Sequence, residues 1–118
     1  LADFFVTASV SEVHPLTVLE AMAAGLPVLG IDSPGVSDTV VNGVNGFVVE
    51  NDYAALALKM LRLFSEPDAR ASLADGARQS SLRYDIRTTT QRYVEIYEEQ
   101  IRQRRPARRR WWTLGRRP

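Results

Sequence analysis

The strongest constraint on the fold is a segment in which two short apolar runs flank a stretch of helical periodicity. The runs are residues 4–8 and 27–31, and each is almost free of polar side chains. Runs of this length are typical of strands buried in a parallel sheet. Residues 16–24 space apolar side chains along one helix face, and Gly25 and Pro27 then end the helix. This strand–helix–strand unit predicts an α/β fold with parallel strands.

Further turn and helix signals follow this unit. Two Asn-Gly pairs, at Asn42 and Asn45, predict turns ahead of another short strand. A short helix is predicted at residues 36–41, and the strand at residues 47–49. Three longer helices are predicted at residues 52–65, at 68–82 and from 86 to beyond 102, with Asp85 as the cap of the last. The first long helix is predicted to bury Leu56, Met60, Leu61 and Phe64, and the last groups Tyr93, Ile96, Tyr97 and Ile101 on one side.

The charge of the chain is unevenly distributed. The 118 residues suffice for one domain, and 45% hydrophobic with 25% charged residues is typical of globular proteins. All 14 acidic residues but only 7 of the 15 basic residues lie in residues 1–99, whereas residues 100–118 hold 8 Arg and no acid. We therefore divide the chain into a globular part, residues 1–102, and an Arg- and Trp-rich tail, residues 103–118, expected to be disordered in solution.

The tail admits three interpretations. Arg residues beside Trp111 and Trp112 suit an anionic membrane surface, because the cations attract lipid phosphates and Trp favours the interface. Nucleic acid would use the same charge, but no nucleic-acid-binding motif accompanies it, and we expect no such partner. The third interpretation is a solvated tail. The sequence contains no Cys, signal peptide or apolar run of about 20 residues, so we expect a cytoplasmic protein, peripheral to the inner face of the membrane.

Two glutamates mark the candidate site. Glu12 lies in the loop before the first predicted helix, and Glu20 lies about one turn inside it. The loop follows the end of a presumed parallel strand, where open α/β sheets bind ligands, and the helix start suits phosphate. A sugar and a ribose joined by a diphosphate would present hydroxyls to both carboxylates. The alternative is structural, because Ser9 and Glu12 also fit a helix-capping box.

The segment resembles the signature of the family-four retaining glycosyltransferases, which have the GT-B fold. Their signature is a Glu, seven residues, and a second Glu followed by Ala-Met-Ala-x-Gly-x-Pro-Val, as in residues 12–28. The resemblance continues in residues 2–9, in Pro34-Gly35 and in the Gly-rich segment 42–49. It covers about residues 2–99 and implies an α/β fold with a partial Rossmann-like parallel sheet flanked by helices, the C-terminal half of a GT-B donor-binding domain.

The resemblance implies a role for each residue of the site. Glu20 would bind the ribose hydroxyls of a UDP- or GDP-sugar, and Glu12 would contact the donor sugar and act at the reacting carbon. The main chain at Leu16 and Thr17 would hold the diphosphate. The implied reaction is transfer of the sugar to an acceptor, a lipid or a polysaccharide, with retention of configuration, no cofactor and no essential metal ion.

The loop departs from the family pattern after Glu12. The family often has Gly-Phe-Gly there, whereas this chain has Val13-His14-Pro15. Pro15 has no N–H to donate, so its backbone contacts would shift to Val13, His14 or Leu16. His14 would either touch the donor or face solvent. Residues 34–37 would either line the nucleotide site or serve only as a turn.

A complete enzyme of this kind has two Rossmann-like domains. We expect an N-terminal domain outside this chain, because the sequence opens without Met and its first basic residue is Lys59. Two alternatives are a GT-B sugar epimerase and a non-catalytic, membrane-associated binding module. Neither needs both Glu12 and Glu20 beside a helix start.

Overall fold

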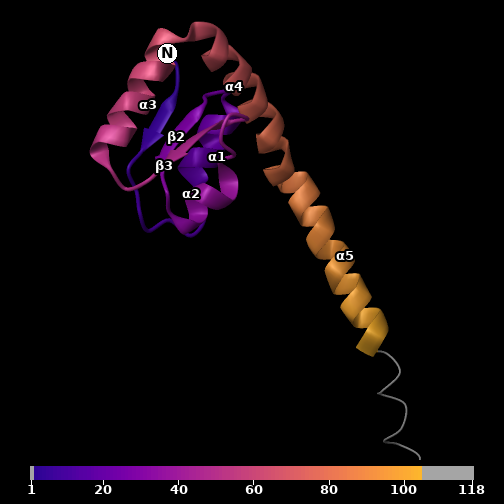
Figure 1. Cartoon of the computed structure of the whole chain (residues 1–118). Helices are drawn as coiled ribbons and strands as arrows, with labels where there is room; N and C mark the ends of the chain where they lie inside the picture. Colours follow the sequence, from indigo (N-terminus) through magenta and orange to yellow (C-terminus); the bar gives the residue numbers. More distant parts are fainter. Residues whose placement is uncertain (1, 105–118) are drawn as a thin grey trace, which may run out of the picture. The chain divides into compact units, whose positions relative to one another are not determined.

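The structure, a computed structural model, describes residues 2–104 (Figure 1). The chain divides into two compact units, Leu1–Tyr84 and Asp85–Pro118. The first unit contains β1 (Phe5–Thr7), α1 (Leu16–Ala23), β2 (Val28–Ile31), α2 (Pro34–Thr39), β3 (Gly46–Val49), α3 (Tyr53–Ser65), α4 (Pro67–Ser81) and the 3₁₀ turn η1 (Leu82–Tyr84). The second contains α5 (Ile86–Arg104).

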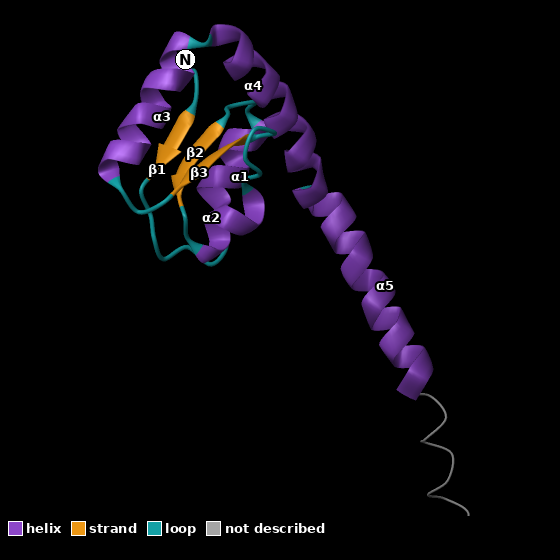
Figure 2. Cartoon of the chain, in the orientation of Figure 1, coloured by secondary structure: helices purple, strands orange, loops and turns teal. Residues whose placement is uncertain are grey.

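The three strands form one parallel sheet in the order β1-β2-β3 (Figure 2). Phe5 pairs with Val28 at one side of β2, and Val28 pairs with Gly46 at the other. All four residues of β2 are buried, because β2 is the central strand and both of its faces are covered. The predicted α/β fold with a parallel sheet flanked by helices is thus confirmed.

Side chains of β2 point alternately to two hydrophobic clusters, one on each face of the sheet. Val28 packs against α1 and α2 through Met22 and Val36, which are both fully buried. Leu29 packs on the other face against α3 through Leu63. Helix α4 contributes Ala77 to the first cluster and Leu73 to the second. The alternation follows from the two-residue period of a strand, and it produces three layers with the sheet in the middle.

Helix α1 ends where Gly25 adopts a backbone conformation that other residues rarely adopt. Its φ is +77°, in the left-handed region. The amide of Gly25 donates to the carbonyl of Met22, and the amide of Leu26 donates to that of Ala21, both at 2.9 Å. This is the Schellman arrangement, which satisfies the last carbonyls of a helix. The predicted stop signal at Gly25 is confirmed.

The predicted core face of α3 is partly wrong. Leu56 is buried and Met60 is partly buried, but Leu61 and Phe64 are 63% and 61% exposed. Leu63, which is 2% exposed, takes the inward position. Because α3 is apolar around most of its circumference, Leu61 and Leu63 each belong to a row of apolar side chains with helical spacing. The spacing alone therefore fits either residue as the buried one.

Helix α5 begins as predicted. The Asp85 carboxylate accepts a hydrogen bond from the amide of Arg87 at 2.8 Å, which caps the helix. Gln103 and Arg104 form its last two residues, so the helix extends into the segment that we assigned to the tail. Residues 105–118, on which the prediction of disorder falls, lie outside the described part of the chain. No helix within residues 2–104 combines the length and apolar character needed to cross a membrane.

Candidate functional site

The candidate site is the loop that joins β1 to α1. Because the strands are parallel, this loop leaves the sheet at the same edge as the ends of β2 and β3. That edge is where open parallel sheets bind their ligands. Glu12 is half-buried in the loop, whereas Val13 and His14 are exposed. Val13 has 90% of its surface accessible, so its side chain contributes nothing to the core.

The first turn of α1 lacks a side-chain cap. Its N-cap residue is Pro15, with φ −78° and ψ 86°. The Pro15 carbonyl accepts hydrogen bonds from the amides of Val18 and Leu19, at 3.0 and 3.2 Å. The two preceding amides, of Leu16 and Thr17, find no acceptor within the helix, as is usual for a first turn. They are therefore available to an anion, and the helix dipole favours one there.

Glu20 lies on α1 about 6 Å further along the helix axis than Leu16, by the standard rise per residue. Its side chain is exposed. The sequence motif thus places Glu12 before the helix, two open amides at its start and an exposed carboxylate one turn inside it.

Glu12 is held by hydrogen bonds at both its side chain and its backbone. The Ser9 hydroxyl donates to the Glu12 carboxylate at 3.0 Å. The Gly35 amide donates to the Glu12 carbonyl at 2.9 Å. The capping-box alternative is wrong, because Ser9 and Glu12 lie in the loop and the helix starts only at Leu16. The hydrogen bond between Ser9 and Glu12 is present, but it lies within the loop and does not cap a helix.

His14 faces an aromatic neighbour that sequence reasoning missed. Its ring lies 6.5 Å from the ring of Tyr84, measured between centroids, and the two planes are inclined by 56°. Tyr84 ends η1, a turn that follows α4. No local pattern relates residues 70 positions apart, so only the packing of α4 along α1 could reveal this pair.

Two basic side chains of the first unit contact residues outside the first turn of α1. Arg78 packs against Gly25, at the C-terminal end of the helix, and forms an ion pair with Asp75 at 3.2 Å. Lys59 lies on α3, with its ammonium 4.3 Å from the centre of the Phe47 ring. Within residues 2–104, no group of three or more His, Asp or Glu side chains is placed to hold a metal ion.

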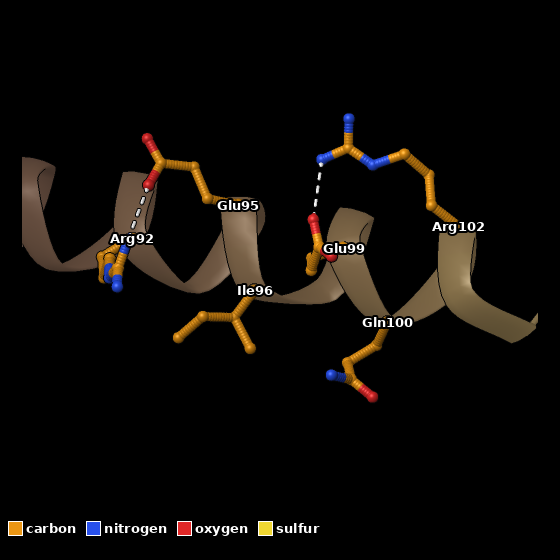
Figure 3. A pocket seen from close by; sticks show the side chains of 6 residues that line it. All are labelled: Arg92, Glu95, Ile96, Glu99, Gln100 and Arg102. Atoms are coloured by element: carbon orange, nitrogen blue, oxygen red, sulfur yellow. Dashed lines mark hydrogen bonds and ion pairs between the residues drawn. The ribbon is translucent and has the colours of Figure 1, made fainter.

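A depression also runs along α5, and none of its lining residues comes from the loop or from α1. It is lined by Arg92, Glu95, Ile96, Glu99, Gln100 and Arg102, all from this one helix (Figure 3). Because one exposed helix forms the whole of its wall, it encloses no ligand.

Comparison with known proteins gives a family match over most of the first unit. Residues 1–80 match the family model described as "Glycosyl transferases group 1". The matched region includes all three strands, the loop with Glu12, and α1 with Glu20.

Two relatives illustrate the similarity. The N,N'-diacetylbacillosaminyl-diphospho-undecaprenol alpha-1,3-N-acetylgalactosaminyltransferase of Campylobacter jejuni is 33% identical over 101 residues, which are 85% of this chain and 27% of that protein. The D-inositol 3-phosphate glycosyltransferase of Corynebacterium urealyticum is 34% identical over 97 residues, 81% of this chain and 23% of that protein. The chain thus spans about a quarter of the length of the relatives that it matches.

A solved structure shares the fold. The crystal structure of TarM superimposes with a TM-score of 0.72 and 26% identity, over 80% of this chain and 20% of that one. The match agrees with the three-layer arrangement described above.

Proposed function

Because this chain belongs to the group 1 glycosyl transferases, we propose that it forms part of the donor site of an enzyme that transfers a sugar from a nucleotide sugar to an acceptor. The observation that carries the proposal is the start of α1. There, an anchored carboxylate, two open amides and a second, exposed carboxylate follow one another in the order that a nucleotide sugar requires. Family membership supports sugar transfer, whereas the donor, the acceptor and the stereochemical outcome are our proposals.

In the proposed complex, the Glu20 carboxylate accepts hydrogen bonds from the ribose hydroxyls of UDP or GDP. The amides of Leu16 and Thr17 donate to the diphosphate, whose charge increases as the nucleotide leaves. Preorganised amide donors stabilise such a charge without reorganisation of solvent. Glu12 contacts the hydroxyls of the sugar, and transfer proceeds with retention of configuration. The helix start provides the electrostatic stabilisation, so we propose that the reaction requires neither a cofactor nor an essential metal ion.

We propose that Val13 and His14 complete the donor site. Both are exposed in the loop next to Glu12, where the backbone of Val13 and the ring of His14 would face the sugar or the phosphate. Since Pro15 has no amide hydrogen to donate, Val13 and His14 make the contacts of this part of the loop with the donor in the proposed complex.

The remainder of the enzyme is proposed to supply the acceptor site. The chain spans about a quarter of the length of its relatives, and the first turn of α1 carries no basic side chain. We propose that a second domain provides cations for the diphosphate, and that this chain alone does not turn over a nucleotide sugar. The name of the Campylobacter jejuni relative includes a diphospho-undecaprenol, which supports a lipid acceptor, a polysaccharide being the alternative.

We further propose a cytoplasmic enzyme that attaches to an anionic membrane through its C-terminal residues. Eight Arg residues and two Trp residues lie in residues 100–118. Helix α5 leads into this segment, and its Tyr93, Ile96 and Tyr97 are 59%, 45% and 67% exposed. Figure 3 shows Ile96 pointing away from the side of α5 that carries Glu95 and Arg102. An apolar helix side followed by a basic segment is typical of proteins that bind membrane surfaces.

The donor site is tested by titrating the chain with UDP, GDP and their glucose and mannose conjugates, followed by NMR. Replacing Glu20 with Ala should weaken the preferred nucleotide about 10- to 100-fold, because hydrogen bonds to a charged group are lost. The matched control is Glu98→Ala, which removes another exposed helical carboxylate, on α5. Equal losses in both variants, or none in Glu20→Ala, would contradict the assignment of Glu20.

A further inference from the structure

The loop that carries Glu12 has little internal structure to fix it. Val10 is 53% exposed, and the neighbouring Ser11, Val13 and His14 are exposed as well. Such a segment moves unless other elements hold it, because few apolar contacts restrain its backbone. Glu12 nevertheless has a defined position, and its contacts show that the start of α2 is what holds it.

The first contact is between backbones. The Gly35 amide donates to the Glu12 carbonyl at 2.9 Å, and Gly35 is the second residue of α2. A Cβ on Gly35 would lie 2.6 Å from that carbonyl oxygen and 3.0 Å from the Cδ of Pro15. The φ of Gly35 is not positive, so backbone freedom is not the reason for a glycine here. Gly35 is needed because the loop passes too close for any side chain.

The second contact comes from Ser33, the N-cap residue of α2. Serine is favoured at this position because its hydroxyl can accept a hydrogen bond from an amide of the first turn. Ser33 makes no such bond. Its hydroxyl, on a residue that is only 5% exposed, donates instead to the carbonyl of Ser9 at 3.2 Å. A buried cap residue thus holds the distant β1–α1 loop in place of its own helix.

Ser9 connects this anchor to the carboxylate. Its amide donates to the Thr7 hydroxyl at 3.2 Å, and its own hydroxyl donates to Oε1 of Glu12 at 3.0 Å. The hydroxyl of Ser9 therefore orients the carboxylate, while Ser33 fixes the backbone of Ser9. Within residues 2–104, no side chain or amide donates to the second carboxylate oxygen, Oε2, so the proposal assigns that oxygen to the ligand.

We propose that Ser9, Ser33 and Gly35 are positioning residues that set the place and rotamer of Glu12 for recognition of the donor sugar. This inference rests on the proposed function of Glu12. It adds that sugar recognition and nucleotide recognition are separable in this site. Glu12 depends on α2 through the three positioning residues, whereas Glu20 and the open amides lie on α1, to which none of these hydrogen bonds is made.

The proposal is tested by NMR titration of the 118-residue chain with UDP and UDP-glucose, and with GDP and GDP-mannose. The measured quantity is the sugar increment, the ratio of the affinity for the nucleotide sugar to that for the nucleoside diphosphate. Ser9→Ala and Ser33→Ala should each lower this increment about 3- to 10-fold, the usual effect of one lost hydrogen bond, and leave diphosphate affinity unchanged. Gly35→Ala should lower it about 10-fold or more.

The controls distinguish positioning from general stability. Ser65→Ala removes a hydroxyl that donates to the carbonyl of Leu61 within α3 and not to the loop, and should leave the increment unchanged. Ser9→Thr keeps the hydroxyl and should restore most of the increment. An increment that stays at the wild-type value in both Ser9→Ala and Ser33→Ala would overturn the proposal. An equal fall in the diphosphate affinity and in the sugar increment would also overturn the proposal, because it would show that the whole site was disturbed.

Hydrogen exchange separates this proposal from the proposed function. The Gly35 amide should exchange slowly in the wild type and faster in Ser33→Ala, whether or not a ligand is present. If the chain binds none of the four probes, the proposed donor site fails for this chain, and the positioning contacts are judged by exchange alone. A Gly35 amide that exchanges as fast as that of exposed Ser11 would then overturn them.

Discussion

The guanidinium of Arg78 occupies the space that a Cβ on Gly25 would fill. Gly25 ends α1 with φ +77°, and Arg78 belongs to α4, so the contact joins the two helices where α1 turns back toward the sheet. Gly25 is required by the left-handed backbone at this turn, and it also leaves room for the Arg78 side chain. The packing of α1 against the sheet and α4 sets the orientation of the helix, and with it the place of Glu20 on its surface.

Gly25→Ala should destabilise the protein by about 1–2 kcal/mol, measured by urea unfolding, because it puts a non-glycine residue in the left-handed region. The Arg78 guanidinium is the end of a flexible side chain that is 58% exposed, so it moves aside at little cost. Gly43→Ala is the matched control, because its φ is +76° and no atom of the described residues lies within 4 Å of the added Cβ. The two variants should lose nearly the same stability. A clearly larger loss in Gly25→Ala would show that the Arg78 contact itself stabilises the fold.

Leu16→Pro should reduce the affinity for UDP or GDP about 5- to 10-fold and leave the stability of the fold nearly unchanged. Proline is tolerated at the first helical position but removes the amide hydrogen that we assign to the diphosphate. Leu16→Ala keeps the amide and serves as the control, since the Leu16 side chain is 62% exposed. Uridine and guanosine, which lack phosphate, should bind the three proteins equally in the same NMR titration. Loss of nucleoside binding in Leu16→Pro would point to damage beyond the amide.

Leu63→Ala should destabilise the fold by about 2–5 kcal/mol, whereas Leu61→Ala should cost less than about 0.5 kcal/mol. The reason is burial, because Leu63 is 2% exposed within the cluster beneath α3 and Leu61 is 63% exposed. Both substitutions remove the same atoms from the same helix, so propensity cancels. Urea unfolding of the two variants decides which stripe of α3 faces the core, and a larger loss in Leu61→Ala would reverse the assignment.

Binding to vesicles should depend on the C-terminal segment and on anionic lipid. The chain should sediment with phosphatidylserine-containing vesicles, and removal of residues 103–118 should abolish this. Each Arg near such a surface contributes about 1 kcal/mol, so binding should weaken as salt is raised. Neutral phosphatidylcholine vesicles are the control for charge. Equal sedimentation of the full and shortened chains would contradict membrane attachment through this segment.

Much of the fold follows from local sequence, and the elements were predicted for local reasons. The apolar runs that became β1 and β2, the stop at Gly25 and the cap at Asp85 all depend on residues within a few positions of one another. A helix-length period, a positive φ and a capping carboxylate are properties of a short stretch of chain. The order of Glu12, the helix start and Glu20 is likewise a matter of spacing along the sequence.

The assignments that sequence reasoning missed depend on contacts between distant elements. The periodicity of α3 fitted both Leu61 and Leu63, and only packing against the sheet selected Leu63. Spacing also could not show that Ser33 would reach the carbonyl of Ser9, 24 residues earlier.

Short-range patterns and one spaced motif predict the helices and strands, the parallel α/β class and the family from the amino-acid sequence. The surroundings of Glu12 instead follow from packing between elements that are distant in the sequence. The loop that carries it is anchored by Gly35 and Ser33 because α2 packs against it with no room for a side chain between them. That proximity results from the stacking of α2 and the loop at one edge of the sheet, and no local pattern contains it.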